Sequence, residues 1–259
     1  MTSASLQGLR VLVTRPADRA ETLCRLLASH GAEVVHLPMQ AIEPVRQSAA
    51  AARALQQGRD ALAWIFTSVN AVRYARRLDA GVWPTCIAVG PATAAALAQA
   101  GITDVRLPAD RHDSEGVLAL PELAEVQGRS VLIITGEGGR EAIQGGLVAR
   151  GAQVVRVEVY RRVFLPHAPE TLARALAGID AAIVTNGEAL QQLIERAPAD
   201  LRNPLRAVQL VVPSQRVVEQ ALELGFTRIP LVPEQITDTG YLHRLERWWA
   251  TMRRMTNDR

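Results

Sequence analysis

The sequence repeats itself, and this internal duplication constrains the fold more than any other feature. Short signals recur in the same order in the two halves of the chain, separated by 118 to 125 residues. Because four ordered matches at nearly one separation are hard to obtain by chance, they indicate a duplicated set of structural units. The matched segments are 10–16 with 130–140, 60–72 with 180–190, 86–108 with 210–233, and 113–118 with 238–242.

Each matched segment is typical of a strand followed by a helix. The runs RVLVT and SVLIIT are rich in β-branched residues, and Gly31 and Gly151 follow corresponding helical patterns. Any single match has a simpler explanation, since α/β proteins commonly cap helices with Thr or Ser after apolar strands. The ordered set predicts an α/β protein with two similar parallel-sheet domains and helices on both faces. Periodicity leaves open whether each repeat forms its own domain or the first βαβ unit is exchanged.

The composition excludes several classes of enzyme. All 29 basic residues are arginine, so a Schiff-base lysine, a Walker-type phosphate loop and a kinase lysine are absent. The five histidines are scattered and the two cysteines, Cys24 and Cys86, stand alone, so we expect no metal site and no disulfide. A chain of 259 residues that is 48% hydrophobic has room for two domains, each with its own core.

The sequence also bounds the partners and the compartment. No apolar run approaches the roughly 20 residues that cross a bilayer, and the first residues lack a signal-peptide pattern, so we expect a cytoplasmic protein without membrane contact. The net charge of +3 and the arginine-rich end WWATMRRMTNDR are interpreted as a solvated helix face, with no nucleic-acid partner.

Small polar residues and arginines gather at the predicted carboxyl ends of the strands. Helix N-termini present free N–H groups at that edge of a parallel sheet, so two such rims facing a cleft suit a large anion with several carboxylates. For any one of these residues helix capping or a turn is the simpler role. The candidate substrate-binding residues are Thr14, Arg15, Thr67, Ser68, Asn70, Gly90, Ser114, Gly138, Gly139, Arg140, Thr185, Asn186, Ser214 and Arg216, with Thr135, Gly136 and Gly187 on the same rims.

Acid–base candidates are few. The segment TGEGGR matches neither GxGxxG nor the Walker spacing, so we expect no nucleotide cofactor. Neither a GxSxG elbow nor a Cys/His nucleophile is present, which leaves tyrosine. Of the three tyrosines, Tyr160 is unusual because it stands in the extended segment VEVYRRVF, whereas Tyr74 and Tyr241 fall in helical patterns. Tyr160 either borders the active site or is a half-buried aromatic of a connecting strand.

The ordered motifs resemble those of the uroporphyrinogen-III synthases. The resemblance runs from about Leu9 to Leu245 through VLVTRP, FTSVNAV, VGPATAAAL, SEGVL, GEGGRE, GAQVVRVEVYRR and LELGF, and it departs at TNGEAL, where Ser more often follows Thr. It implies one domain of residues 1–37 plus 167–259, a second of residues 46–158, and a two-stranded extended connector of residues 38–45 and 159–166, with a cleft between the domains.

The same resemblance implies an activity. The substrate is hydroxymethylbilane, which loses water and closes, with its last ring inverted, to uroporphyrinogen III without a cofactor. Tyr160 matches the family tyrosine that acts as general acid toward the departing hydroxyl. A monomer is implied, with the upstream bilane-forming enzyme as a possible partner. The alternatives are a non-catalytic sensor that binds an anionic or tetrapyrrole ligand, and a two-domain glycosyltransferase.

Overall fold

Two compact units make up the chain. The structure, a computed structural model, describes residues 4–139 and 141–257. One unit comprises residues 1–41 and 164–259, here called unit 1, and the other comprises residues 42–163, here called unit 2. The chain therefore passes between the units twice, once near Ala41 and once near Val163.

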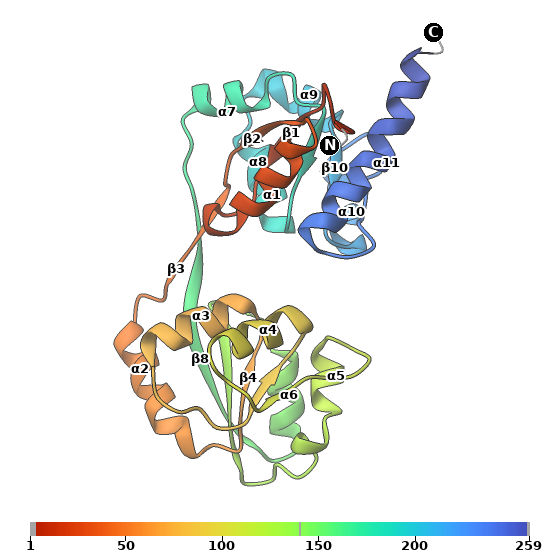
Figure 1. Ribbon diagram of the computed structural model, residues 1–259. Coiled ribbons are helices and arrows are strands. Elements are labelled where there is room, and N and C mark those ends of the chain that lie inside the picture. Colours follow the sequence, from red (N-terminus) through yellow and green to blue (C-terminus); the bar gives the residue numbers. More distant parts are fainter. Residues whose placement is uncertain (1–3, 140, 258–259) are drawn as a thin grey trace. The chain divides into compact units, whose positions relative to one another are not determined.

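Unit 1 contains a four-stranded parallel sheet in the order β10-β9-β1-β2. The N-terminal strand β1 pairs with β9, so the first βαβ segment lies in the same sheet as the C-terminal part of the chain (Figure 1). The strands are β1 (Arg10–Val13), β2 (Glu33–His36), β9 (Ala181–Ile183) and β10 (Gln209–Val211). The helices are α1 (Ala17–Ser29), α7 (Pro169–Leu176), α8 (Gly187–Arg196), η3 (Ala199–Leu201), α9 (Arg202–Arg206), α10 (Gln215–Glu223) and α11 (Asp238–Asn257).

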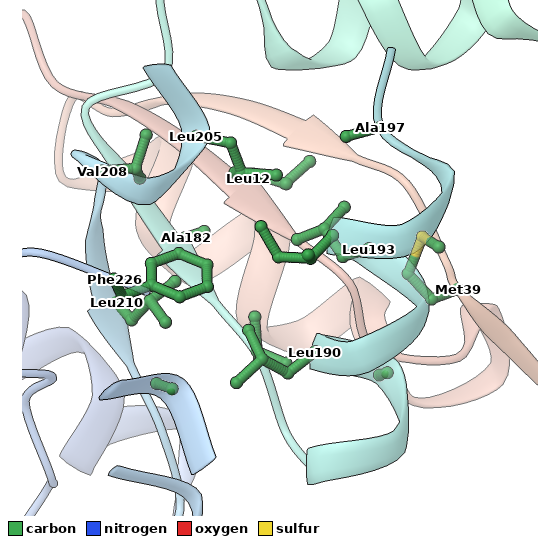
Figure 2. Packing of buried hydrophobic residues seen from close by; sticks show 14 of the residues in the cluster. Leu12, Met39, Ala182, Leu190, Leu193, Ala197, Leu205, Val208, Leu210 and Phe226 are labelled. Carbon is green, nitrogen blue, oxygen red and sulfur yellow. The ribbon is translucent and has the colours of Figure 1, made fainter. Parts of the chain in front are cut away.

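Alternation along the strands of unit 1 produces two cores. Val11 and Val13 pack with α1 and α11 on one face, whereas Leu12 packs with α8 and α10 on the other. Figure 2 shows the second face, where Leu12, Ala182 and Leu210 of three neighbouring strands lie against Leu190 and other apolar side chains. Helices therefore cover both faces of the sheet, as expected for buried parallel strands.

Unit 2 contains a six-stranded sheet in the order β3-β8-β7-β4-β5-β6. The strands β8 through β6 are parallel, and β3 runs antiparallel to β8, since Val45 N–H donates to Val159 O while Leu165 N–H donates to Met39 O. The strands are β3 (Gln40–Pro44), β4 (Ala63–Phe66), β5 (Cys86–Ala88), β6 (Val105–Arg106), β7 (Ser130–Gly136) and β8 (Gln153–Phe164). The helices are α2 (Ser48–Gln57), η1 (Gly58–Asp60), α3 (Val69–Leu78), α4 (Pro91–Gln99), α5 (Ser114–Leu118), η2 (Pro121–Leu123) and α6 (Ala142–Ala149).

Helices also cover both faces of the sheet in unit 2. Trp64 and Phe66 pack with α2, α3 and α4, while Ala63 and Ile65 pack with α5 and α6. Position by position, the order β10-β9-β1-β2 of unit 1 corresponds to β5-β4-β7-β8 of unit 2. The duplication predicted from the sequence is thus visible in the topology of the two sheets. Of the described helices, none combines the length and the hydropathy that crossing a membrane requires.

Truncation of Leu12 tests the core of unit 1. Its side chain is fully buried in the central strand β1, so Leu12→Ala is expected to lower the free energy of unfolding by about 2–5 kcal/mol, measured by urea denaturation. The same substitution at Leu222, which is 46% exposed on α10, should cost less than about 1 kcal/mol. Equal losses at the two positions would contradict the packing described for β1.

Candidate active site

The order of the strands reverses at one place in each sheet. In unit 1 this place lies between β1 and β9, and in unit 2 between β7 and β4. The helices that follow these strands pack on opposite faces of the sheet. In unit 1, α1 covers one face and α8 the other, and in unit 2, α6 covers one face and α3 the other. Such a switch point leaves a crevice outside the carboxyl ends of the strands, which is where ligands bind in parallel α/β sheets.

At the switch point of unit 2, two threonines hydrogen bond to each other. Thr67 Oγ1 donates to Thr135 Oγ1 at 3.1 Å and lies 3.3 Å from Ile134 O. Gly139 follows in a tight turn closed by its N–H to Gly136 O, and a side chain at Gly139 would overlap Thr135 Oγ1. Gly138 has φ +68°, a conformation that favours glycine. Gly138 and Gly139 therefore permit a tight turn after β7.

Tyr160 lies in the core of unit 2 beside the same switch point. It is only 3% exposed, and its hydroxyl oxygen is 3.1 Å from Ser68 Oγ. Ser68 is the N-cap of α3 and accepts a hydrogen bond from Ala71 N–H. The ring of Tyr160 also contacts that of Tyr74, at 5.9 Å between centroids. The structure thus brings together two residues that the sequence proposed separately, Tyr160 and Ser68.

Asn70 stands in the first turn of α3 and is 6% exposed. Its Oδ1 has no hydrogen-bond partner within the part of the chain that the structure describes. A buried amide oxygen without a donor is uncommon and costs free energy. This unsatisfied acceptor lies two residues from Ser68, and the role of Asn70 in binding stays a prediction.

At the switch point of unit 1, Thr14 is buried and donates through N–H and Oγ1 to Ile183 O. The next residue, Arg15, forms an ion pair with Asp238 at 2.5 Å, and its guanidinium carbon lies 5.5 Å from the centre of the Tyr241 ring. The cation that the sequence proposed for a ligand therefore already has a partner, and a bound anion would compete with Asp238 for it.

Asn186 caps α8, with its Oδ1 accepting from Ala189 N–H at 2.8 Å. Its Nδ2 donates to Gln40 Oε1 at 3.0 Å, and Gln40 Nε2 donates to Glu188 at 3.2 Å. The asparagine at the position where the family more often has serine thus holds β3 to α8. Gln40 was not among the sequence candidates, although it precedes Tyr160 by 120 residues, as Gly31 precedes Gly151.

The other described candidates stand near the N-termini of helices or directly after a strand. Gly90 and Ser214 are the N-caps of α4 and α10, Arg216 is exposed in the first turn of α10, and Thr185 follows β9. Ser114 opens α5 behind its N-cap Asp113, where the N–H of Gly116 and the guanidinium of Arg111 lower the pKa of the Asp113 carboxyl. Arg140 lies outside the described residues.

The chemistry offered by these residues is that of hydrogen-bond donors and one phenol. Among the described residues, no group of three or more His, Cys, Asp or Glu side chains is arranged to hold a metal ion. The carboxyl edges instead present hydroxyls, backbone N–H groups at helix N-termini and arginines. This arrangement suits an anionic substrate and a reaction that needs a proton donor.

Comparison with known proteins points to a single family. A model of the family described as uroporphyrinogen-III synthase HemD matches residues 21–242. The uroporphyrinogen-III synthase of Escherichia coli is 33% identical over 89% of this chain and 97% of its own length, and that of Salmonella typhimurium is 34% identical with the same coverage.

Solved structures agree with the fold. A mutant uroporphyrinogen III synthase of Thermus thermophilus superposes with a TM-score of 0.62 over 93% of this chain and all of the other, at 21% identity. The Helicobacter pylori uroporphyrinogen-III synthetase gives a TM-score of 0.59 over 91% of this chain and 97% of the other, at 12% identity.

Substitution of Gly136 tests the packing of Tyr160. A Cβ at Gly136 would lie 2.5 Å from Tyr160 Cζ, so Gly136→Ala is expected to displace the phenol and to cost about 1–3 kcal/mol in the free energy of unfolding. Urea denaturation and a crystal structure of the variant measure both effects. Gly145→Ala is the control, because its Cβ meets no atom within 4 Å and should stabilise α6 by up to about 1 kcal/mol. An unmoved Tyr160 ring at full stability would contradict this geometry.

Removal of the Tyr241 hydroxyl tests how the free energy of unfolding depends on pH. Burial raises the pKa of Tyr241 to about 12, although Arg15 opposes the shift, whereas the phenol of an unfolded chain titrates near about 10. The folded state holds this proton more tightly, so the contribution to stability is complete below about pH 10 and is lost as the pH rises toward 12.

The hydroxyl of Tyr241 is buried without a partner among the described residues, so Tyr241→Phe should leave the free energy of unfolding at pH 7 unchanged or higher. Between pH 10 and 11.5 the variant should lose less stability than the wild type, as followed by urea denaturation at each pH. Parallel losses in the two proteins would show that Tyr241 does not titrate as described.

Proposed function

The chain belongs to the uroporphyrinogen-III synthase family, and from this premise we propose how its residues carry out the reaction. The enzyme cyclises hydroxymethylbilane to uroporphyrinogen III. The single observation that carries the assignment is identity of about a third over 97% of the length of the curated relatives. A sensor or a glycosyltransferase finds no support in these comparisons.

The reaction breaks a C–O bond, a C–C bond and a C–H bond, forms two new C–C bonds and releases water without a net redox change. The hydroxymethyl C–O bond breaks and the oxygen leaves as water. The electron pair of the attached pyrrole stabilises the positive charge that remains on the carbon. The carbon then bonds to the last ring and gives a spiro intermediate. The earlier C–C bond at the spiro centre breaks, and a new C–C bond closes the macrocycle with the last ring inverted and a proton lost from that ring. Since no oxidant or reductant is consumed, the proposal includes no cofactor. The protein must position the reacting ring and disfavour direct closure.

We propose that the carboxyl edges of the two sheets bind the acetate and propionate groups of the substrate. Support comes from the free N–H groups of the helices that start there and from the unsatisfied oxygen of Asn70, which suits a pyrrole N–H. The proposed binding residues are Thr14, Arg15, Thr67, Ser68, Asn70, Gly90, Ser114, Gly138, Gly139, Arg140, Thr185, Asn186, Ser214 and Arg216.

Tyr160 is proposed as the general acid that protonates the departing hydroxyl. Its support is a hydroxyl held by Ser68 at the switch point of unit 2, in surroundings that exclude most solvent. The acid serves only the first step, because the closure of the macrocycle releases a proton that restores the phenol. Binding and orientation of the substrate make up the rest of the rate enhancement.

Finer points of the proposal concern the organisation of the enzyme. The domain limits 1–37 plus 167–259 and 46–158, and the connectors 38–45 and 159–166, remain predictions. They are supported by the division of the chain near Ala41 and Val163. A cytoplasmic monomer, which receives its substrate from the upstream bilane-forming enzyme, is proposed from the biosynthetic role of the family.

A coupled assay tests the function and the acid together. Hydroxymethylbilane is generated in situ, the products are oxidised, and the type I and type III isomers are separated. The wild type is expected to yield mostly type III, and Tyr160→Phe to lower kcat by about 10²-fold because the proton donor is lost. The matched control is Tyr74→Phe, which removes a phenol that donates to Ile42 O and should leave kcat unchanged.

The outcomes separate two levels of the proposal. Full type III turnover by Tyr160→Phe would remove the acid role and leave the enzyme assignment intact. Only type I product from folded wild-type protein would contradict the activity itself.

A further inference from the structure

We propose that Ser68 is a positioning residue for Tyr160: its O–H donates to the phenolic oxygen, so that the phenol's own proton points toward the leaving hydroxyl of the substrate. The inference rests on the proposed general-acid role of Tyr160. It assigns the hydroxyl of Ser68 to the phenol of Tyr160, in place of the direct contact with the substrate proposed for it above.

The hydrogen bonds around Ser68 allow this direction of donation, and the acid role of Tyr160 requires it. Ser68 Oγ already accepts from Ala71 N–H at 3.1 Å, as the cap of α3. A serine hydroxyl has one proton to give, and the phenolic oxygen of Tyr160 lies 3.1 Å away to receive it. A phenol that donated to Ser68 would not have its proton available for the substrate. Donation by Ser68 leaves that proton available.

The backbone places Tyr160 against Ser68 through an irregularity in the sheet. In β8, Val157 and Val159 are buried on the face that packs against α3, so strict alternation would turn residue 160 to the opposite face. The register between β7 and β8 shifts where Thr135 faces Glu158 and Gly136 faces Tyr160, which leaves one extra residue in β8. This bulge brings Tyr160 to the face of Val157 and Val159.

Close packing then holds the ring in place. Gly136 has no side chain at the point where a Cβ would come within 2.5 Å of Tyr160 Cζ, and Tyr74 covers the ring from α3. Glu137 N–H donates to Tyr160 O and fixes the backbone at the bulge. The remaining freedom of the phenol is the direction of its proton, which is the freedom that Ser68 removes.

The other repeat contains an equivalent hydrogen bond, here called the tether, between a strand residue and a helix cap, but without an acidic group. Gln40 precedes Tyr160 by 120 residues and Asn186 follows Ser68 by 118, and Asn186 donates to Gln40 at 3.0 Å. In both cases a side chain of an extended strand, β3 or β8, is thus bonded to the residue that caps a helix from another part of the chain, α8 or α3. Because an amide pair has no acidic proton at this place, the repeat indicates an inherited tether that gained chemistry in unit 2.

Proton transfer at the site balances as follows. The phenolic O–H bond of Tyr160 breaks as its proton joins the leaving oxygen, the C–O bond of the substrate breaks, and water departs. The phenolate retains the electron pair and is stabilised by the O–H of Ser68 and by the positive N-terminal end of α3. The proton released when the macrocycle closes returns to the phenolate.

A double-mutant cycle tests the inference. Ser68→Ala is expected to lower kcat by about tenfold with KM changed less than about twofold, because it removes a hydrogen bond to a group that becomes charged. Ser68→Thr keeps the hydroxyl and should restore kcat to within about threefold of the wild type. In the Tyr160→Phe background, Ser68→Ala should cause no further loss of kcat, since Ser68 acts through the phenol.

Thr237→Ala controls for the loss of a helix cap. Thr237 Oγ1 accepts from Gly240 N–H at 3.1 Å near the start of α11, in the same geometry as Ser68, so the variant should lose about 1 kcal/mol of stability and keep its kcat. Thermal unfolding of every variant verifies that the protein compared is folded.

Two results would overturn the inference. One is a loss on Ser68→Ala that is equally large with Phe at position 160, which would mean that Ser68 acts on its own. The other is unchanged kcat in Ser68→Ala while Tyr160→Phe is impaired, which would leave the acid role standing without its positioning residue. If Tyr160→Phe itself turns over at the wild-type rate, the general-acid proposal fails first, and this inference fails with it.

Discussion

Parallel pairing is the constraint on which the rest of this structure depends. When all strands of β10-β9-β1-β2 run in one direction, their carboxyl ends must meet at one edge of the sheet, and the same holds from β8 to β6 in unit 2. Each strand needs a helix on the return path, so helix N-termini collect at that edge with their unpaired N–H groups. Polar residues that follow the strands are therefore both helix caps and candidates for contact with a ligand. The concentration of Thr, Ser and Asn at these positions follows from that double requirement.

A residue that caps a helix has already used part of its hydrogen-bonding capacity. Asn186 uses its oxygen on Ala189 N–H and its amide N–H on Gln40. Thr14 caps no helix but likewise uses its hydroxyl, on Ile183 O. Ser68 has one lone pair committed to Ala71 N–H and retains its second lone pair and its single proton. Such accounting separates the candidates by what each has available: Asn70 retains an unused acceptor, Arg15 must leave Asp238, and the helix N-termini retain their N–H groups. The site is thus better described by its free donors and acceptors than by the residue types present.

Duplication explains why one protein contains a structural and a chemical version of the same contact. The pair Gln40–Asn186 and the pair Tyr160–Ser68 occupy equivalent places in the duplicated sequence, since their members stand 120 and 118 residues apart. The amide pair satisfies buried polar groups and fixes β3 to α8, which is a structural task. The phenol and hydroxyl pair satisfies the same requirement while holding one transferable proton. In the proposed mechanism the two pairs differ in one respect, that the phenol has a transferable proton, and the bulge in β8 turns residue 160 to the face of Ser68.

The sequence by itself determined the two α/β repeats, the strand ends that form the carboxyl edges, and Tyr160 as the exceptional tyrosine, because apolar periodicity, Gly31 and Gly151, and caps such as Ser68 are local signals. It did not determine that β1 pairs with β9 across some 170 residues of chain, since strand pairing depends on contacts that no local pattern encodes. The commitment of Arg15 to Asp238 and the role of Gln40 were equally invisible, because each partner comes from a distant segment. Nor did alternation predict the face of Tyr160, because the one extra residue in β8 inverts the pattern. Only tertiary structure decided these points, for a hydrogen bond or an ion pair exists only after the fold has brought its two ends together.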